Sequence, residues 1–494
     1  MTFKELLTLV SSQDPPRLCA DSRCVDLGDI FVAIEGSAHD GHDFIDQAIA
    51  NGAKYIVADK REAAYETPHT EHEIIVVEDS ASAAAALAQA GKGNPASQLT
   101  HLAVTGTNGK TTVAYLVRSC IQNAGQKCGL IGTIIYDTGS DSSQAALTTP
   151  DCFAIAEMQF QMLKAGAKYM VIEASSHALS QNRLAAIKFK AAAFTNLSGD
   201  HLDYHKTKAD YLAAKTKLFQ ALSPDAIAVL NKQSPEAAQI ARKTHAEVLW
   251  YAIDAPADLT AHIESTDITG TVFILEYAQK SKIENRKSSI IKTPLLGRHN
   301  VSNHLAAAGL CLAAGFDLET VAAGSSALKM IPGRLEKLDW DGDFSVFIDY
   351  AHTDDALKSV LATLKPLCKG NLMVVFGCGG DRDRTKRPRM ARVAELLAAF
   401  IIVTSDNPRT EQPEHIIDEI VAGFENPDSR TIVVEPDRKK AVDLAIKTAG
   451  KNDIVLIAGK GHETYQIIGT QRFDFSDKDI AQKCLRKRNE RILS

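Results

Sequence analysis

The segment from Val104 to Thr112 constrains the fold of this chain more than any other part of the sequence. It contains the Gly-rich run Gly106-Thr-Asn-Gly-Lys-Thr-Thr112, which follows an apolar stretch at 101–104 and precedes a helix-like stretch at 113–118. A strand, a Gly-rich turn and a helix in this order form a phosphate-binding loop, because the N–H groups and the dipole at the start of the helix attract anions. The pattern therefore predicts that the chain binds ATP or GTP.

The loop is shorter than the standard nucleotide-binding pattern, because Val104 occupies the place of the first glycine, five positions before Gly109. Lys110 can still reach the terminal phosphates, and the Thr111 hydroxyl can ligate Mg²⁺. Glu173 ends an apolar run at 169–173, where a carboxylate can hold the same ion. The alternatives are a Gly-rich surface turn and an ordinary acidic residue at the end of a strand.

Composition limits the class of protein. The chain has 494 residues, of which 23% are charged and 45% hydrophobic, and its formal net charge is −6. Roughly three domains are expected for this length, and the mild acidity gives no reason to expect nucleic acid as a partner. The nine cysteines form no Cys-x-x-Cys pair, so reduced thiols fit better than disulfides or a zinc site. We expect a cytoplasmic protein without membrane insertion, because neither a signal peptide nor a membrane-spanning apolar run is evident. We also expect a monomer.

Three regions with different patterns follow one another. Residues 1–97 alternate short strands and helices and end in a polar linker, residues 98–331 contain the Gly-rich loop, and residues 332–494 alternate regularly. Strands that alternate with helices predict parallel sheets covered on both faces, with ligands at the carboxyl ends of the strands. We therefore predict an α/β fold in which a central P-loop-type ATPase domain lies between an N-terminal α/β domain and a Rossmann-like C-terminal domain. The basic segment 280–292 is predicted to be a solvated hairpin or loop.

Polar and charged residues cluster just after the predicted strands. The segment from Thr195 to His205 is rich in Asp and His, which suggests a second metal or phosphate site or an ordinary surface loop. The third region adds four clusters, at 349–352, 377–382, 406–409 and 459–463. Their arginines suit carboxylates and their glutamate suits an ammonium, so a small zwitterionic ligand fits them. Any one of the four could be a simple turn, but together they are expected to converge on one rim.

Taken together, these segments resemble the Mur ligase family, and most closely its members that add the third residue of the peptidoglycan stem peptide. The resemblance runs in order over nearly the whole chain, through Asp21-Ser-Arg23, the Gly-rich loop, Thr148-Thr-Pro150, 173–183, 196–215, Gly297-Arg-His-Asn300, Pro332-Gly-Arg334 and the clusters of the third region. The loop alone is shared with other amide ligases, including folylpolyglutamate synthase. The family implies that a substrate carboxylate attacks the γ-phosphate of ATP, and that an amine then attacks the resulting acyl phosphate.

The resemblance also implies a role for each matching residue. Lys110 neutralises the β- and γ-phosphates, Thr111 and Glu173 hold one Mg²⁺, and His201 ligates a second Mg²⁺. Lys215 matches the lysine that the family carries as a carbamate, an anion that can orient a metal ion where an ammonium would be repelled. The positions that match the three substrates are Gly106, Thr107, Asn108, Gly109, Lys110, Thr111, Thr112, Asn300, Arg334 and Asp349 for ATP; Ser22, Ser37, Ala38, His39, Thr148, Thr149, Ser175, Gln181 and Arg183 for UDP-N-acetylmuramoyl-L-alanyl-D-glutamate, whose UDP the N-terminal domain would bind; and Arg382, Asp406, Asn407, Pro408, Arg409, Gly459 and Glu463 for the amino acid.

The amino acid is predicted to be meso-diaminopimelate. Asp406-Asn-Pro-Arg409 is the form associated with that acceptor, and lysine-adding relatives have a different residue in place of Arg409. A guanidinium can bind the distal carboxylate of diaminopimelate through paired hydrogen bonds but repels the ammonium of lysine. The alternatives are a lysine-adding ligase, a folylpolyglutamate synthase, and a P-loop regulatory protein without ligase activity. Domain closure is expected, with pivots near Gln98 and Arg334.

Overall fold

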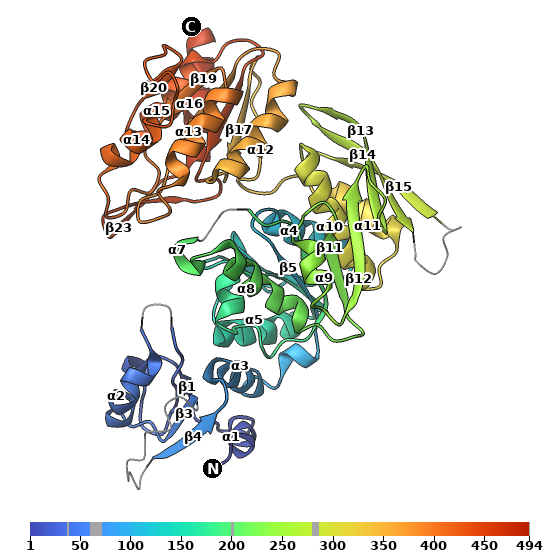
Figure 1. The fold of residues 1–494 in the computed structure, drawn as a ribbon, viewed down its shortest axis with the longest axis vertical. Helices are drawn as coiled ribbons and strands as arrows, with labels where there is room; N and C mark the ends of the chain where they lie inside the picture. The colour runs from blue at the N-terminus through green and yellow to red at the C-terminus, as the bar shows by residue number, and fades with distance from the viewer. Residues whose placement is uncertain (37–38, 60–71, 199–201, 279–285, 494) are drawn as a thin grey trace.

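The computed structural model describes residues 1–36, 39–59, 72–198, 202–278 and 286–493. Figure 1 shows three α/β domains in a row, with the N-terminal domain in blue, the central one in green and yellow, and the C-terminal one in orange and red. The predicted α/β class is confirmed, while the domain boundaries at 97 and 331 stay predictions. Within the described residues, no helix is long and apolar enough to cross a membrane.

The N-terminal domain is built on a parallel sheet in the order β1-β2-β3-β4. Its strands are β1 (Leu18–Cys19), β2 (Ile30–Val32), β3 (Tyr55–Asp59) and β4 (Glu73–Val77), and its helices are α1 (Phe3–Val10), α2 (Ile45–Ala50) and α3 (Ser80–Ala90). The polar segment after α3, predicted to be a linker, contains a short 3₁₀ helix at Pro95–Ser97. The Gln89 amide donates to Gln159 over 2.6 Å, which ties α3 to the central domain.

The central domain contains an eleven-stranded sheet in the order β15-β14-β13-β12-β11-β10-β5-β9-β6-β7-β8. The strands are β5 (Thr100–Thr105), β6 (Cys128–Ile131), β7 (Ile135–Asp137), β8 (Ser142–Gln144), β9 (Tyr169–Glu173), β10 (Phe189–Phe194), β11 (Ile227–Asn231), β12 (Glu247–Ile253), β13 (Leu259–Asp267), β14 (Gly270–Ala278) and β15 (Arg286–Thr293). The strands from β13 to β6 pair in parallel, whereas both ends of the sheet are antiparallel. The described part of the basic segment 280–292 forms β15, one arm of the hairpin.

Helices cover both faces of this sheet, as the alternating pattern predicts. The helices are α4 (Lys110–Asn123), α5 (Cys152–Lys164), α6 (Ser176–Ser180), α7 (Leu202–His205), α8 (Lys208–Gln220), α9 (Ala237–Ala241), α10 (Arg298–Ala313) and α11 (Leu318–Ala327). One apolar core unites α4, α10 and α11, and a second core unites α5, α8 and α9 on the opposite face. Both cores are nearly inaccessible to water, which is the main source of stability for such a layered domain.

The C-terminal domain has a six-stranded sheet in the order β16-β17-β21-β18-β19-β20, parallel except for β16. Its elements are β16 (Glu336–Lys337), β17 (Ser345–Asp349), α12 (Asp354–Leu364), β18 (Leu372–Phe376), α13 (Lys386–Leu397), β19 (Phe400–Val403), α14 (Pro413–Val421), β20 (Ile432–Val434), α15 (Arg438–Thr448), β21 (Ile454–Ala458), the hairpin β22 (Tyr465–Ile468) and β23 (Gln471–Asp474), and α16 (Asp477–Leu493). The regular alternation of strands and helices predicted for the third region is confirmed.

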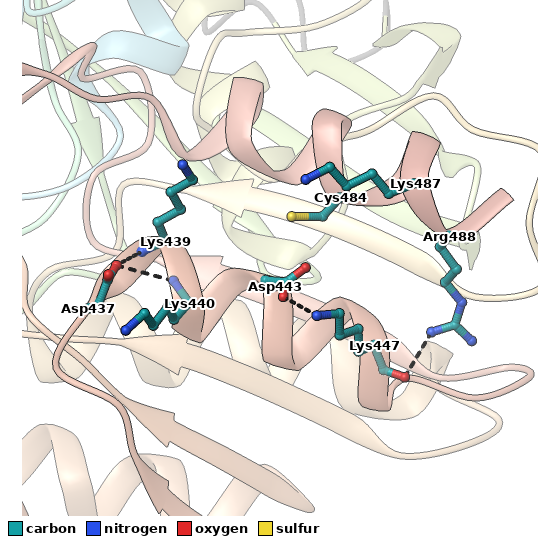
Figure 2. Close-up of a pocket in the computed structure, with 8 residues that line it drawn as sticks. All are labelled: Asp437, Lys439, Lys440, Asp443, Lys447, Cys484, Lys487 and Arg488. Carbon is teal, nitrogen blue, oxygen red and sulfur yellow. Dashed lines mark hydrogen bonds and ion pairs between the residues drawn. The ribbon is translucent and has the colours of Figure 1, made fainter. Parts of the chain in front are cut away.

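Helices α15 and α16 border a cavity of about 480 Å³. Figure 2 shows that its charged side chains serve the two helices themselves. Asp437 accepts from the first N–H groups of α15, Asp443 pairs with Lys447 at 2.5 Å, and Arg488 donates to the Lys447 carbonyl oxygen. None of the candidate site residues lines this cavity, so the chemistry has to be sought elsewhere.

Candidate functional site

A cavity of about 340 Å³ lies where the central and C-terminal domains meet. All the predicted ATP-binding residues except Gly106 line it, and so do Thr133, Thr148 and Glu173. These residues come from the loop after β5, the end of β9, the start of α10 and the segment around β17. The carboxyl end of β5, with β9 on one side and β10 on the other, is where an open parallel sheet is expected to bind its ligand.

The Gly-rich loop leaves the start of α4 open to an anion. Gly109 is the N-cap residue, with φ of +90°, and no side chain caps the first turn of the helix. The N–H groups of that turn therefore remain available to phosphate oxygens. A Cβ atom on Gly109 would lie 2.3 Å from Oδ1 of Asn303, a buried residue of α10. Both the backbone conformation and the close approach of α10 require glycine here.

Two lysines converge on the same loop carbonyl. Lys110 Nζ donates to the carbonyl oxygens of Gly106, at 3.0 Å, and Thr107, at 2.9 Å. Lys215 is only 1% exposed, and its Nζ donates to the Gly106 oxygen at 2.8 Å. The Lys215 ammonium also lies 4.3 Å from the centre of the Tyr211 ring. Gly106 does not line the cavity, but its carbonyl oxygen holds both lysines beside the phosphate-binding loop.

Glu173 is fully buried at the end of β9 and faces the loop. Its Oε2 accepts from the Thr111 hydroxyl at 3.0 Å and from the Thr133 hydroxyl at 2.9 Å, and its Oε1 accepts from the Thr133 N–H at 2.9 Å. A carboxylate beside a hydroxyl supplies the oxygen ligands that Mg²⁺ prefers, with phosphate oxygens completing its shell. The donor set thus fits Mg²⁺. Among the described residues, no three His, Cys, Asp or Glu side chains form a metal cluster, and His201 lies outside those residues.

The C-terminal domain closes the cavity. Arg334 donates to the Thr111 hydroxyl at 3.1 Å, and its guanidinium lies 4.7 Å from the centre of the Tyr350 ring. Asp349 accepts from the N–H groups of Leu335, at 2.6 Å, and Ala351, at 2.7 Å. Burial raises the pKa of the Asp349 carboxyl, against the opposing effect of the Arg334 cation. Arg334 therefore joins the third domain to the proposed metal ligand.

On the other side of Glu173 lie residues predicted to bind the muramoyl peptide. The Thr149 hydroxyl donates to the Glu173 carbonyl oxygen at 2.6 Å and contacts the Ser175 hydroxyl at 3.1 Å. Arg183 donates to the Thr149 carbonyl oxygen at 2.7 Å and to Oε1 of Gln181 at 2.6 Å. Thr148 contacts the Thr133 hydroxyl at 3.1 Å. These five predicted residues therefore form one network beside the proposed metal ligand.

The N-terminal domain faces a third cavity, of about 220 Å³, which Gln181 lines together with Gly36, Asp79 and Tyr204. Ser22 is buried and donates to Oε1 of Gln47 at 2.8 Å, outside this lining. His39 is exposed, and its ring lies 6.2 Å from that of Phe44. Ser37 and Ala38 lie outside the described residues. The structure thus places Gln181, but not Ser22, at the boundary between the two domains.

The four clusters of the third region do converge at the carboxyl ends of its strands. Asn407 donates to Oε2 of Glu463 at 3.0 Å, and the buried Lys460 donates to both of them, at 3.1 and 2.9 Å. Gly459 has φ of +116°, and a Cβ atom on it would lie 2.6 Å from Oδ2 of Asp406. These contacts make Asp406, Asn407, Gly459 and Glu463 neighbours.

Cations control the charge of this rim. Burial by itself raises the pKa of the Asp406 carboxyl, but the nearby Lys460 and Arg438 outweigh it, so the pKa lies below its usual value. Arg438 is fully buried in a paired contact with Asp477 and donates to the Ala458 carbonyl oxygen at 2.8 Å. The Asp406 carboxylate is therefore ionised at neutral pH.

The arginines of the rim are less enclosed. Arg409 has φ of +52° after Pro408, and its guanidinium donates to the Gly380 carbonyl oxygen at 2.8 Å. Within the described residues its other guanidinium nitrogens make no hydrogen bond, so they are open to a carboxylate. Arg382 is exposed and donates to the Asp381 carbonyl oxygen at 3.0 Å.

Sequence reasoning missed several residues that shape the site. Lys460 stands inside the cluster 459–463, and its position between two glycines was the available signal. Thr133 and Asn303 carry no local signal, because they reach the site only through the packing of β6 and α10. Arg387, a fully buried arginine of α13, likewise has no motif around it.

Comparison with known proteins accounts for this arrangement. Residues 17–92 match the Mur ligase family catalytic domain, residues 104–311 the Mur ligase middle domain, and residues 333–461 the Mur ligase glutamate ligase domain. This chain belongs to the Mur ligase family. It is 42% identical over 475 residues to the UDP-N-acetylmuramoyl-L-alanyl-D-glutamate--2,6-diaminopimelate ligase of Gloeobacter violaceus, with 96% of this chain and 94% of that protein covered.

Solved structures support the same family. A structure of a UDP-N-acetylmuramoyl-L-alanyl-D-glutamate--2,6-diaminopimelate ligase matches 99% of both chains, with a TM-score of 0.66 and 32% identity. The folylpolyglutamate synthase of Mycobacterium tuberculosis, complexed with ADP and AMPPCP, covers 75% of this chain and 91% of its own, with a TM-score of 0.60 and 20% identity. The second likeness concerns the fold alone.

Replacement of Gly109 by alanine tests the open helix start. We expect Gly109→Ala to weaken nucleotide binding by roughly 100-fold, because the loop must move away from Asn303. Gly125→Ala is the matched control: Gly125 also has a positive φ, of +73°, but a Cβ atom there would meet nothing within 4 Å. Calorimetric titration with ATP gives both dissociation constants. Equal effects of the two substitutions would show that backbone strain alone, and not the clash, explains the requirement for glycine.

Proposed function

We propose that this chain is an ATP-dependent amide ligase that adds meso-diaminopimelate to UDP-N-acetylmuramoyl-L-alanyl-D-glutamate, a step of peptidoglycan precursor synthesis. The observation that carries the proposal is the meeting of two sets of residues at the boundary between domains. The phosphate-binding loop with Glu173 belongs to the central domain, and Arg334 and Asp349, which line the same cavity, belong to the C-terminal one. The name of the Gloeobacter violaceus relative supports the choice of substrates.

The first chemical step brings anions together. The γ-phosphate of ATP and the attacking carboxylate repel each other, so cations must neutralise them in the transition state. Lys110 lies at the loop, and Arg334 lies at the Thr111 hydroxyl. Thr111 and Glu173 would hold Mg²⁺, which when bound supplies charge neutralisation at the phosphates. The residues of the loop orient ATP, while Thr149, Gln181 and Arg183 orient the peptide carboxylate.

Lys215 poses an electrostatic problem that carbamylation resolves. Its side chain is buried and ends beside the carbonyl oxygen of Gly106, close to where a metal ion and phosphates would lie. A buried ammonium repels a nearby metal ion, whereas a carbamate carries a negative charge that attracts it. We propose that the neutral amine of Lys215 attacks CO₂ and releases one proton to solvent, which leaves a carbamate anion. We also propose that His201 ligates a second Mg²⁺ near this carbamate.

The acceptor site is complementary to meso-diaminopimelate in charge. The amino acid carries two carboxylates and two ammonium groups. Arg382 and Arg409 are placed to bind the carboxylates, and Asp406 and Glu463 to bind ammonium groups. Lysine lacks the distal carboxylate and would leave a guanidinium unpaired against its ammonium. The phosphate-rich substrates support a site of action in the cytoplasm, where we propose that the chain works as a monomer.

Release of phosphate by the purified protein tests the proposal. The reactions contain ATP, Mg²⁺ and UDP-N-acetylmuramoyl-L-alanyl-D-glutamate, with meso-diaminopimelate, L-lysine or no amine. We expect ADP and phosphate to form only with diaminopimelate, because the acyl phosphate needs an amine to complete the turnover. Turnover with lysine would reject the specificity assignment but keep the ligase. Slow hydrolysis that ignores both amines would identify a P-loop regulatory protein instead.

Replacement of Lys215 tests the carbamate. We expect Lys215→Ala to lower kcat by roughly 10²–10³-fold, because an electrostatic group next to the reacting phosphate is lost. Added formate or acetate should restore part of the activity, and ¹³C-bicarbonate should give a carbamate NMR signal in the unmodified protein only. Lys217→Ala is the control, because Lys217 lies on the same helix but donates to the exposed Ser180 carbonyl oxygen. A protein with no carbamate signal and no rescue would contradict the assignment.

Replacement of Arg409 tests acceptor recognition. Arg409→Asn removes the guanidinium while keeping a residue that tolerates a positive φ. We expect kcat/KM for diaminopimelate to fall by roughly 10–10³-fold, because a paired, charge-assisted contact is lost. The KM for ATP should not change. Arg392→Gln serves as the control, since Arg392 forms an exposed ion pair with Glu425. A similar fall in kcat/KM for ATP would mean that Arg409 supports the structure of the domain and does not recognise the amino-acid substrate.

A further inference from the structure

Two loops of the C-terminal domain interlock beneath the Arg409 guanidinium. One loop, 377–382, follows β18, and the other, 404–411, follows β19. Gly380 donates its N–H to the Asn407 carbonyl oxygen at 2.9 Å and accepts from Arg409 at 2.8 Å. A Cβ atom on Gly380 would lie 1.9 Å from the Pro408 oxygen. The position of the Arg409 guanidinium therefore depends on the first loop as much as on its own.

A side-chain tether closes this interlock. Asp381 Oδ1 accepts from the Thr410 hydroxyl at 2.7 Å, and its Oδ2 accepts from the Thr410 N–H at 3.2 Å. Asp381 and Arg409 both have a positive φ, of +53° and +52°. Such conformations cost energy for residues with a side chain and persist only where the surroundings enforce them. Asp381 thus holds the residue next to Arg409 from the opposite loop.

An ion pair between the buried Arg387 and the partly exposed Glu411 supports the tether. Glu411 Oε1 accepts from the Asp381 N–H at 2.6 Å, and Arg387 donates to both oxygens of Glu411, at 2.8 and 3.0 Å. Arg387 is fully buried and also donates to Oε2 of Glu419 at 2.8 Å and to the Gly379 carbonyl oxygen at 3.3 Å. The Arg387 hydrogen bonds lower the pKa of the Glu411 carboxyl to about 2. The pair is therefore charged at neutral pH and contacts both loops.

We infer that Asp381, Glu411 and Arg387 are positioning residues that determine acceptor specificity by holding the Arg409 guanidinium in place. The inference rests on the proposed function and explains why Arg409 would discriminate between diaminopimelate and lysine. A guanidinium on a mobile loop can turn away from a lysine ammonium, and the repulsion that excludes lysine is then lost. A guanidinium fixed on the Gly380 oxygen cannot turn away. It therefore binds an amino acid that has a distal carboxylate and repels one, such as lysine, that has an ammonium group there.

A positioning role for Asp381, Glu411 and Arg387 has different consequences from a general structural role. Loss of general support lowers stability and affects every substrate. Loss of the tether displaces one guanidinium, and a displacement of about 1 Å in a charged site costs roughly 100-fold in the efficiency of the substrate that uses it. ATP and the nucleotide-linked peptide bind in other cavities, so their KM values report on the rest of the molecule.

The experiment measures KM and kcat for diaminopimelate, lysine and ATP in Asp381→Gly, Thr410→Val and the double variant. Glycine keeps the positive φ at 381, and valine keeps the shape of Thr410, so each change removes mainly the tether. We expect the KM for diaminopimelate to rise roughly 10- to 100-fold, with an unchanged KM for ATP and a smaller preference over lysine. The double variant should be no worse than Asp381→Gly, because both changes break one contact.

Controls make the outcomes distinct. Arg392→Gln removes an exposed arginine of α13 that pairs with Glu425, away from both loops, and it should leave all three KM values unchanged. Arg387→Lys tests the buried pair, since lysine keeps the charge but cannot contact both Glu411 oxygens in the same geometry. An unchanged preference for diaminopimelate over lysine, or an equal loss for ATP, overturns the inference. Failure of the unmodified protein to use diaminopimelate instead overturns the proposed function, and it is seen before any variant is measured.

Discussion

The parallel pairing of β5 with β9 is the constraint on which the rest of the site depends. In this register Val104 lies beside Glu173, and the Gly-rich loop begins two residues after Val104. β10 pairs with the other edge of β5 and places Phe194 beside Thr105. The sheet therefore places the buried Glu173 carboxylate next to the phosphate-binding loop, at the same end of the parallel strands. A one-residue slip of β9 would turn Glu173 to the opposite face of the sheet.

The domain boundary adds what the sheet cannot provide. Arg334 reaches the Thr111 hydroxyl from the C-terminal side, so the cavity proposed to bind ATP is complete only while the two domains are together. A Cβ atom on Gly333 would lie 2.2 Å from the His462 nitrogen, which places the proposed pivot against the acceptor rim. The same short segment thus touches the nucleotide cavity and the acceptor loops. Movement of the C-terminal domain would change both together, which is the arrangement that a two-step transfer between domains needs.

Buried cations organise the acceptor rim. Lys460 and Arg438 are almost inaccessible to water, and each contacts a carboxylate or a carbonyl group of the strand ends. Charges buried in this way are tolerated only with close partners, and removal of one partner costs far more than the pair contributes. Such residues fix the loops in one geometry instead of adding much stability. Arg387 performs the same task for the loops around Arg409.

The sequence by itself determined the elements and the chemistry that each strand end carries. The alternating pattern indicated the α/β class, and the Gly-rich run, Glu173 and the Asp406–Arg409 cluster could be recognised locally, because each depends on neighbours within a few positions. Only the tertiary structure decided which of these residues meet. Thr133, Asn303 and Arg387 join the site through contacts with partners far away in the chain, as Arg387 does with Glu411 at a separation of 24 residues. Such contacts follow from strand order and helix packing, and these are properties of the whole fold that no local pattern encodes.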